Sequence, residues 1–155
     1  MKKILLTVVA IFAMSTMANA QIKDLGVRGA FGAGAGAELS AMWDCGLLGA
    51  NRLETDLGWA GNKDWGYINL TGIVQWTGDL GSNFGWFAGV GANLGLYNGN
   101  DADYDGFGLG LAAQVGLEYN FSIPIQLTLD FRPGWSFIGH SGFGYGVALG
   151  IRYRF

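Results

Sequence analysis

The last 13 residues of the chain read Phe143-Gly144-Tyr145-Gly146-Val147-Ala148-Leu149-Gly150-Ile151-Arg152-Tyr153-Arg154-Phe155. Odd positions hold large apolar or aromatic residues, whereas even positions hold glycine, alanine or arginine. Because side chains alternate between the two faces of a β-strand, this pattern predicts a strand with one apolar face and one small or charged face.

The same two-residue period recurs through the rest of the chain. Six more runs carry it clearly, at 25–31, 37–43, 52–59, 84–96, 107–121 and 125–131, and a seventh at 66–76 is less regular. The sequence therefore predicts an all-β protein with eight strands.

The charged residues decide which face of these strands meets the interior. In a soluble sandwich or a lipocalin-like barrel the apolar face would point inward. Here every charged residue of the eight runs, and Arg132 directly after the run at 125–131, lies on the other face: Arg28, Glu38, Arg52, Glu54, Asp56, Glu118, Asp130, Arg132, Arg152 and Arg154. Their five positive and five negative charges balance, which indicates an internal salt-bridge network.

The apolar face carries most of the large rings, near the strand ends: Trp43, Trp59, Trp76, Trp86, Phe107, Tyr119, Phe131, Trp135, Phe143, Tyr145, Tyr153 and Phe155. Such positions suit the aromatic girdles that meet lipid headgroups. An eight-stranded cylinder just holds its own inward side chains, so these rings would not fit inside a small soluble barrel. We therefore expect rings to face lipid, and charges and glycines to fill the lumen.

A bilayer requires such a sheet to close, because an open edge would leave backbone groups unpaired in hydrocarbon. Tilted strands of about 9 to 11 residues span a membrane, and most of these runs reach or approach that length. The prediction is an eight-stranded antiparallel up-and-down transmembrane β-barrel. Pro133 would interrupt the seventh strand, so we expect a bulged outer rim at 131–135.

Composition agrees with one exported domain. Residues 1–20 combine Lys2 and Lys3, an 11-residue apolar run and an A-x-A ending, and predict a cleaved secretory signal peptide before a barrel domain at 21–155. The mature part keeps seven basic and twelve acidic residues, a balance that argues against nucleic acid as a partner. Cys45 is the single cysteine, so no intrachain disulfide forms, and we interpret it as a small residue in a turn.

With these features the chain resembles the small eight-stranded outer-membrane barrels of Gram-negative bacteria, the OmpA/OmpX-type group. The resemblance covers the whole mature chain. It identifies the final strand, with Ile151, Tyr153 and Phe155, as the signal read by the barrel-assembly machinery. The stretches 51–59 and 117–121 further resemble small barrel proteins of Bacteroidetes.

The resemblance also implies a setting. It implies contact with outer-membrane lipid, with the barrel-assembly machinery and with periplasmic chaperones during biogenesis, and it implies a monomer. Both termini would lie in the periplasm, with the connections near 34–36, 61–64, 98–106 and 138–142 facing the medium. With no domain after Phe155, a wall tether of the OmpA kind is not expected.

One loop invites a metal-site hypothesis. Asp101, Asp103 and Asp105 precede Gly106 in the pattern of the first half of a calcium loop, where alternate carboxylates converge on a hard cation. The second half fails, because Ala112 stands where the bidentate glutamate would be. A solvated acidic loop and a weak divalent site both remain open.

Two other motifs point to no chemistry that we expect the protein to perform. His140 and Ser141 are neighbours, so on a strand they would point to opposite faces, which makes general-base contact awkward. The glycine-rich stretch at 89–95 lies inside a period-two run of an exported protein, so we interpret it as small inward residues rather than a nucleotide loop. We expect no enzyme activity and no cofactor.

The inward positions of the outer half are mostly small: Ala30, Gly32, Gly89, Gly91, Gly95, Gly108, Gly110, Gly144 and Gly146. A water pocket or a lipid-chain cavity could open above the charged region, whereas continuous conduction is not expected through so narrow a lumen. The leading hypothesis is a structural or surface-interaction barrel with no named surface partner. The alternative is a lipid-binding or small-ligand-binding barrel, or an enzyme that modifies lipids of the outer leaflet.

Overall fold

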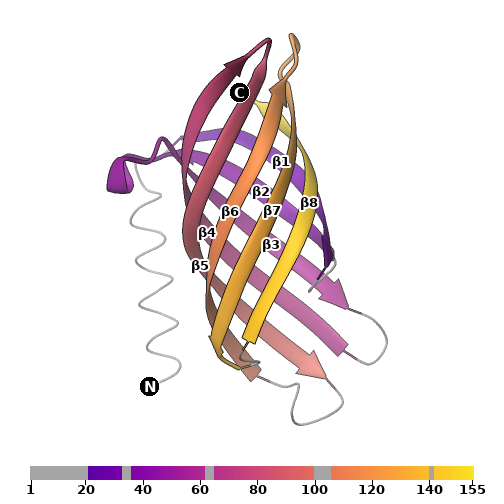
Figure 1. Cartoon of the computed structure of the whole chain (residues 1–155). Helices are drawn as coiled ribbons and strands as arrows, with labels where there is room; N and C mark the ends of the chain where they lie inside the picture. The colour runs from indigo at the N-terminus through magenta and orange to yellow at the C-terminus, as the bar shows by residue number, and fades with distance from the viewer. Residues whose placement is uncertain (1–20, 33–35, 62–64, 100–105, 140–141) are drawn as a thin grey trace.

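A computed structural model describes residues 21–32, 36–61, 65–99, 106–139 and 142–155 of the chain. Eight antiparallel strands form one closed barrel in sequence order, each tilted against the barrel axis (Figure 1). The strands are β1 (Ile22–Gly32), β2 (Gly36–Asp44), β3 (Arg52–Gly61), β4 (Trp65–Gly81), β5 (Phe84–Gly99), β6 (Gly106–Asn120), β7 (Ile125–Ile138) and β8 (Gly142–Arg154). The predicted fold class is confirmed.

The first and last strands close the ring. β1 pairs with β8 from Asp24 opposite Arg154 to Gly32 opposite Gly146. Both chain ends of the barrel therefore lie at the same rim, which we call the terminal rim, and the opposite one the far rim. A short 3-10 turn, Leu47–Gly49, joins β2 to β3 at the terminal rim. In the described ranges no helix is long and apolar enough to cross a bilayer.

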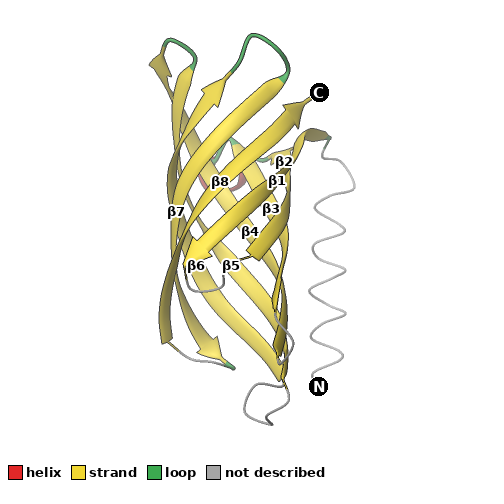
Figure 2. Cartoon of the chain, turned by 90° about the vertical axis from the view of Figure 1, so that its right-hand side faces the viewer, coloured by secondary structure: helices red, strands yellow, loops and turns green. Residues whose placement is uncertain are grey.

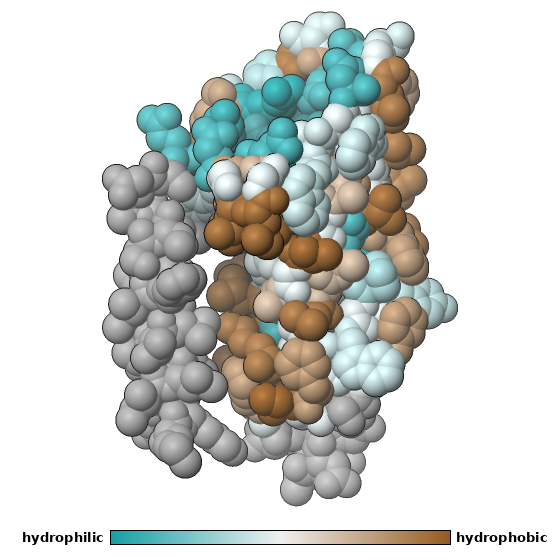
Figure 3. Space-filling view, turned by 60° about the vertical axis from the view of Figure 1, so that its left-hand side comes forward, coloured by the Kyte–Doolittle hydropathy of each residue, from teal (hydrophilic) through white to brown (hydrophobic). Residues whose placement is uncertain are grey.

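The polarity of this barrel is reversed relative to soluble proteins. Trp86 and Leu149 are 39% and 51% exposed on the outside, whereas Arg28 and Arg152 in the lumen are 2% and 1% exposed. Figure 3 shows hydrophobic side chains over much of the wall and hydrophilic ones gathered toward the upper end, where the terminal rim lies. The alternation of the sequence thus sorts apolar residues outward, as expected for a barrel in lipid.

A few apolar side chains also fill the lumen near the terminal rim. Phe87 and Ile73 are fully buried there, although both lie on the face that the sequence pattern marks as small or polar. Glycines give them space: a Cβ on Gly116 would overlap Cζ of Phe87, and one on Gly89 would lie 2.6 Å from Cγ2 of Ile73. Glycine at these positions therefore serves packing inside the barrel.

The expected bulge at 131–135 is wrong in position. β7 continues through Pro133, which pairs with Tyr145 of β8, to Ile138. The ladder to β6 has no pair at Pro133, which lacks an N–H to donate, and resumes at Gly134 opposite Ala112. The register shift lies nearer the far rim, where Leu109 pairs with Ile138 and Gly110 with Ser136.

Candidate functional site

The lumen contains a buried cluster of charges centred on Arg28 of β1. Its guanidinium lies 2.6 Å from a carboxylate oxygen of Asp130 and 3.1 Å from one of Asp56, and it also donates to Glu38. Glu54 lies 3.5 Å from the same group. One cation thus joins carboxylates from three other strands.

Arg132 makes the longest connection across the lumen. Its Nη2 lies 2.6 Å from Asp56 and 3.1 Å from Glu54. Arg132 belongs to β7 and both carboxylates belong to β3, and these strands stand four places apart in either direction around the ring. The ion pairs therefore run straight across the barrel. Arg152 of β8 adds a contact of 3.0 Å to Glu54.

Two further pairs lie toward the terminal rim. Arg52 lies 2.7 Å from Glu118, and Arg154 lies 3.8 Å from Asp24. Asp24 is buried in the lumen, and the sequence analysis missed it because it precedes the first run, although it continues that run's alternation. Among the described residues, six carboxylates and five guanidiniums therefore face the lumen.

Neutral side chains link the charges into one network. Gln75 accepts a hydrogen bond from Nε of Arg52 at 2.6 Å and donates to Gln114 at 2.6 Å and to Glu54. Gln114 in turn donates to Asp130 at 3.0 Å. Ser40, Thr71, Gln126 and Thr128 are also buried on the same face. The two-residue period of each run already places these residues on the lumen face.

A cavity of about 600 Å³ lies on the far-rim side of the cluster. Arg28, Glu38 and Arg132 lie at its charged end, and Tyr67, Asn69 and Tyr97 lie along its wall with Thr71, Asn93 and Ser136. The rings of Tyr67 and Tyr97 stack with centroids 4.6 Å apart. The outer half of the lumen is therefore hollow, as its small residues suggested, but aromatic and amide groups also line it.

These wall side chains rest on glycines of the neighbouring strands. A Cβ on Gly95 would lie 2.8 Å from the ring of Tyr67 and 3.0 Å from that of Tyr97, and one on Gly108 would lie 2.8 Å from the ring of Tyr97. A Cβ on Gly58 would overlap Oδ1 of Asn69, and a Cβ on Gly110 would overlap Oδ1 of Asn93. The rings and amides therefore pack closely against the barrel wall, which leaves the cavity open.

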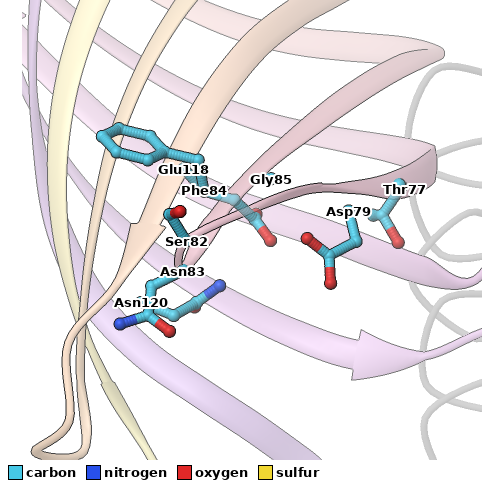
Figure 4. Close-up of a pocket in the computed structure, with 9 residues that line it drawn as sticks. Thr77, Asp79, Ser82, Asn83, Phe84, Gly85, Glu118 and Asn120 are labelled. Atoms are coloured by element: carbon cyan, nitrogen blue, oxygen red, sulfur yellow. The ribbon is translucent and has the colours of Figure 1, made fainter.

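A second hollow, of about 570 Å³, lies at the terminal rim (Figure 4). Polar groups of the β4–β5 hairpin line it, among them Thr77, Asp79 and Asn83, together with Glu118 and Asn120 of the neighbouring β6. In the described part of the chain no group of three His, Cys, Asp or Glu residues is placed to hold a metal ion.

The remaining candidate residues divide into two groups. Ile151 and Tyr153 are about half exposed on the outer face of β8, and the backbone N–H of Phe155 donates to Lys23 at 2.8 Å. Asp101, Asp103, Asp105, His140, Ser141 and the leader at 1–20 lie outside the described residues. The calcium-site and signal-peptide hypotheses therefore stay predictions, as do the lipid-modifying alternative and the role of Phe155 in assembly.

Comparison with known proteins identifies the fold. No protein-family model matches the sequence, and no curated protein does. Among solved structures, Neisserial surface protein A is similar over 85% of this chain and 94% of its own, with 16% identity and a TM-score of 0.62. A major outer membrane protein of Thermus thermophilus is similar over 87% and 100%, with 16% identity and a TM-score of 0.62.

Ail, the attachment invasion locus protein of Yersinia pestis, is similar over 86% of this chain and 97% of its own, with 12% identity and a TM-score of 0.58. The chain thus has the fold of small eight-stranded outer-membrane β-barrels, as the OmpA/OmpX-type resemblance implied. At such low identity the likeness shows the fold alone, and the resemblance to Bacteroidetes barrels stays a prediction.

Proposed function

We propose that this protein is an integral barrel of a Gram-negative outer membrane with a structural role and a lumen that does not conduct. One observation carries the proposal: Arg132 and Asp56, on opposite strands, meet at 2.6 Å across the lumen. Separating such buried charges would leave each without a partner in a low-dielectric interior. An open water path through this layer is therefore costly.

Planar-bilayer recordings test the closed lumen. The purified, refolded barrel should give no discrete conductance steps. A balanced variant with Arg28, Asp56, Asp130 and Arg132 all changed to Ser removes two charges of each sign and should give small steps. The matched control changes Lys23 and Asp44 to Ser, because this pair is exposed at the terminal rim, away from the buried cluster. Conductance steps in the unaltered barrel would contradict the proposal.

Export through the predicted leader is part of the same proposal. The outer-membrane setting is supported by the reversed polarity of the barrel and by its likeness to outer-membrane proteins. Membranes of cells that express the whole chain should contain a product whose mass corresponds to a start at Gln21. A product that retains residues 1–20 would contradict cleavage, and recovery from the inner membrane would contradict the location.

The short connections at the far rim favour a structural role over contacts made by loops. Three residues separate β1 from β2, three separate β3 from β4 and three separate β7 from β8, and six separate β5 from β6. A stable protein interface usually needs about 800 Å² from each partner, which such short connections supply with difficulty. The surface-interaction role therefore has less support.

A second candidate function is ligand binding in the lumen. The cavity of about 600 Å³ favours it, since small-molecule sites commonly occupy roughly 300 to 1,000 Å³. An outer-leaflet enzyme has no such support, because His140 and Ser141 lie outside the described residues.

A further inference from the structure

We propose that the far-rim cavity binds a glycosyl unit, a hydroxylated sugar ring held against Tyr67 and Tyr97. This inference rests on the second candidate function, a ligand-binding barrel. It names the chemistry of the ligand from the groups that line the cavity.

The two tyrosine rings supply an aromatic surface inside a lumen whose other inward residues nearby are small or polar. Tyr67 and Tyr97 pair directly across β4 and β5 and stack on each other. The faces of aromatic rings carry partial negative charge, which attracts the slightly positive C–H groups on one side of a sugar ring. A sugar can therefore bury its C–H face here.

The remaining groups match the hydroxyls of such a ring. Asn69 and Ser136 offer both donors and acceptors, the amide nitrogen of Asn93 adds donors, and Glu38 and Arg132 lie at the inner end. Planar amide, carboxylate and guanidinium groups can each bond two neighbouring hydroxyls. An acyl chain would bury the same polar groups without hydrogen bonds, which is unfavourable for each group left unpaired. The cavity therefore suits a sugar better than a lipid tail.

Glycines keep this space free. With alanine at Gly95 or Gly108, the Cβ would meet a tyrosine ring at 2.8 Å and displace it toward the cavity. The glycines of β5 and β6 thus shape the wall of the site, in addition to the room that others give to Phe87 and Ile73 nearer the terminal rim.

We infer an approach to the cavity from the side, because β1 ends nearer the terminal rim than its neighbour β8. The β1–β8 ladder ends at Gly32 opposite Gly146, whereas the β7–β8 ladder continues to Ser136 opposite Gly142. Figure 2 shows β1 ending part-way along the wall, beside the longer β8. Gly142, Gly144 and Gly146 line the cavity on this side. A sugar could arrive free from the medium or attached to a lipid of the outer leaflet.

Saturation-transfer NMR on the refolded barrel in lipid nanodiscs tests the site, with a panel of free mono- and disaccharides as probes. We expect signal transfer to at least one saccharide. Tyr67→Leu and Tyr97→Leu should each weaken binding roughly twofold to tenfold, the loss of an aromatic contact of about 0.5 to 1.5 kcal/mol. Gly108→Ala should weaken it too, without removal of any polar group.

Two variants control for changes of the same kind elsewhere. Tyr119→Leu removes a tyrosine from the outer face near the terminal rim, and Gly72→Ala adds a methyl group where nothing lies within 4 Å. Both should bind as the unaltered barrel does. Unchanged affinity in the Tyr67 and Tyr97 variants would overturn the inference, because binding would then occur elsewhere.

A second arm presents the same sugar as the headgroup of a glycolipid in the nanodisc. Binding in either arm supports the glycosyl site, and the arm that binds identifies the source. No transfer in both arms, from a barrel that is folded and does not conduct, overturns this inference alone. Saturation transfer to dodecanoate but to no sugar would overturn it in favour of an acyl-chain site. Conductance would instead contradict the closed lumen.

Discussion

Arg28 shows at the scale of one residue how this barrel tolerates buried charge. Its guanidinium approaches carboxylates of Glu38, Glu54, Asp56 and Asp130, from three strands. Burial of an ion costs several kcal/mol unless partners of opposite sign surround it. Here Arg28 pairs with four carboxylates and Arg132 with three, so the removal of Arg28 affects many partners at once.

We therefore expect Arg28→Ala to destabilise the folded barrel by about 3 to 5 kcal/mol, because four buried carboxylates lose a shared partner. Urea unfolding from lipid vesicles, followed by tryptophan fluorescence, measures the change. Lys23→Ala is the control: its pair with Asp44 is 2.8 Å long but about 60% exposed, so its loss should cost about 1 kcal/mol or less. Equal effects of the two variants would contradict a central role for the buried cluster.

Residue positions on the lumen face could be predicted, but contacts between them could not. Alternation assigned Arg132 and Asp56 to the same face. Their meeting depends on the diameter of the ring and on the stagger of the strands, which no single strand encodes. The aromatic wall of the cavity was missed for a related reason: Tyr67 and Tyr97 become neighbours only once β4 and β5 pair.

At the scale of the strand, β8 shows how the two faces differ in what they accept. Val147, Leu149 and Ile151 are exposed on its outer face, and Ala148, Gly150 and Arg152 are buried on its inner face. A charge on the outer face meets lipid, and its cost depends on depth in the bilayer.

Leu149→Arg should therefore destabilise the barrel by about 2 to 4 kcal/mol, since this residue lies in the middle of β8. The matched change Leu96→Arg, close to the far end of β5, should cost about 0 to 1 kcal/mol because the charge can reach the headgroups. Unfolding in lipid vesicles of defined thickness compares the two. A Leu149→Arg variant as stable as the unaltered barrel would argue that this wall does not face lipid.

The strands also show where periodicity is a poor guide to strand ends. β4 runs on to Gly81, beyond the predicted end at Trp76, because its partner β5 continues the ladder as far as Phe84 opposite Gly81. β7 likewise passes through Pro133 because β8 supports it on one side. Strand ends depend on the neighbouring strand, which the pattern of one segment does not contain.

For the whole molecule, closure and reversed polarity have one practical consequence. The outer surface exposes large apolar side chains from all eight strands, among them Leu25, Leu39, Leu57, Leu70, Trp86, Leu117, Leu129 and Leu149. Exposed apolar patches of a few hundred Å² already promote association in water, and the apolar outer surface of this barrel extends over all eight strands.

We expect the processed chain, residues 21–155, to be a folded monomer in detergent and to aggregate when the detergent is removed. Size-exclusion chromatography with light scattering measures both states, and electrophoresis with and without boiling reports folding. A fusion to maltose-binding protein, cleaved at its linker in detergent, controls for protein that is lost during refolding. A stable folded monomer in plain buffer would contradict the membrane interpretation.

The sequence by itself determined the class of this protein: eight strands, their two faces and the inversion of polarity, because alternation is a local property of extended chains. Only the tertiary structure decided which charges meet across the lumen, where the register shifts, and that the far half is hollow with tyrosines and asparagines laid over glycines. These features arise from the closure of the ring, which brings together residues as distant along the chain as Arg28 and Asp130.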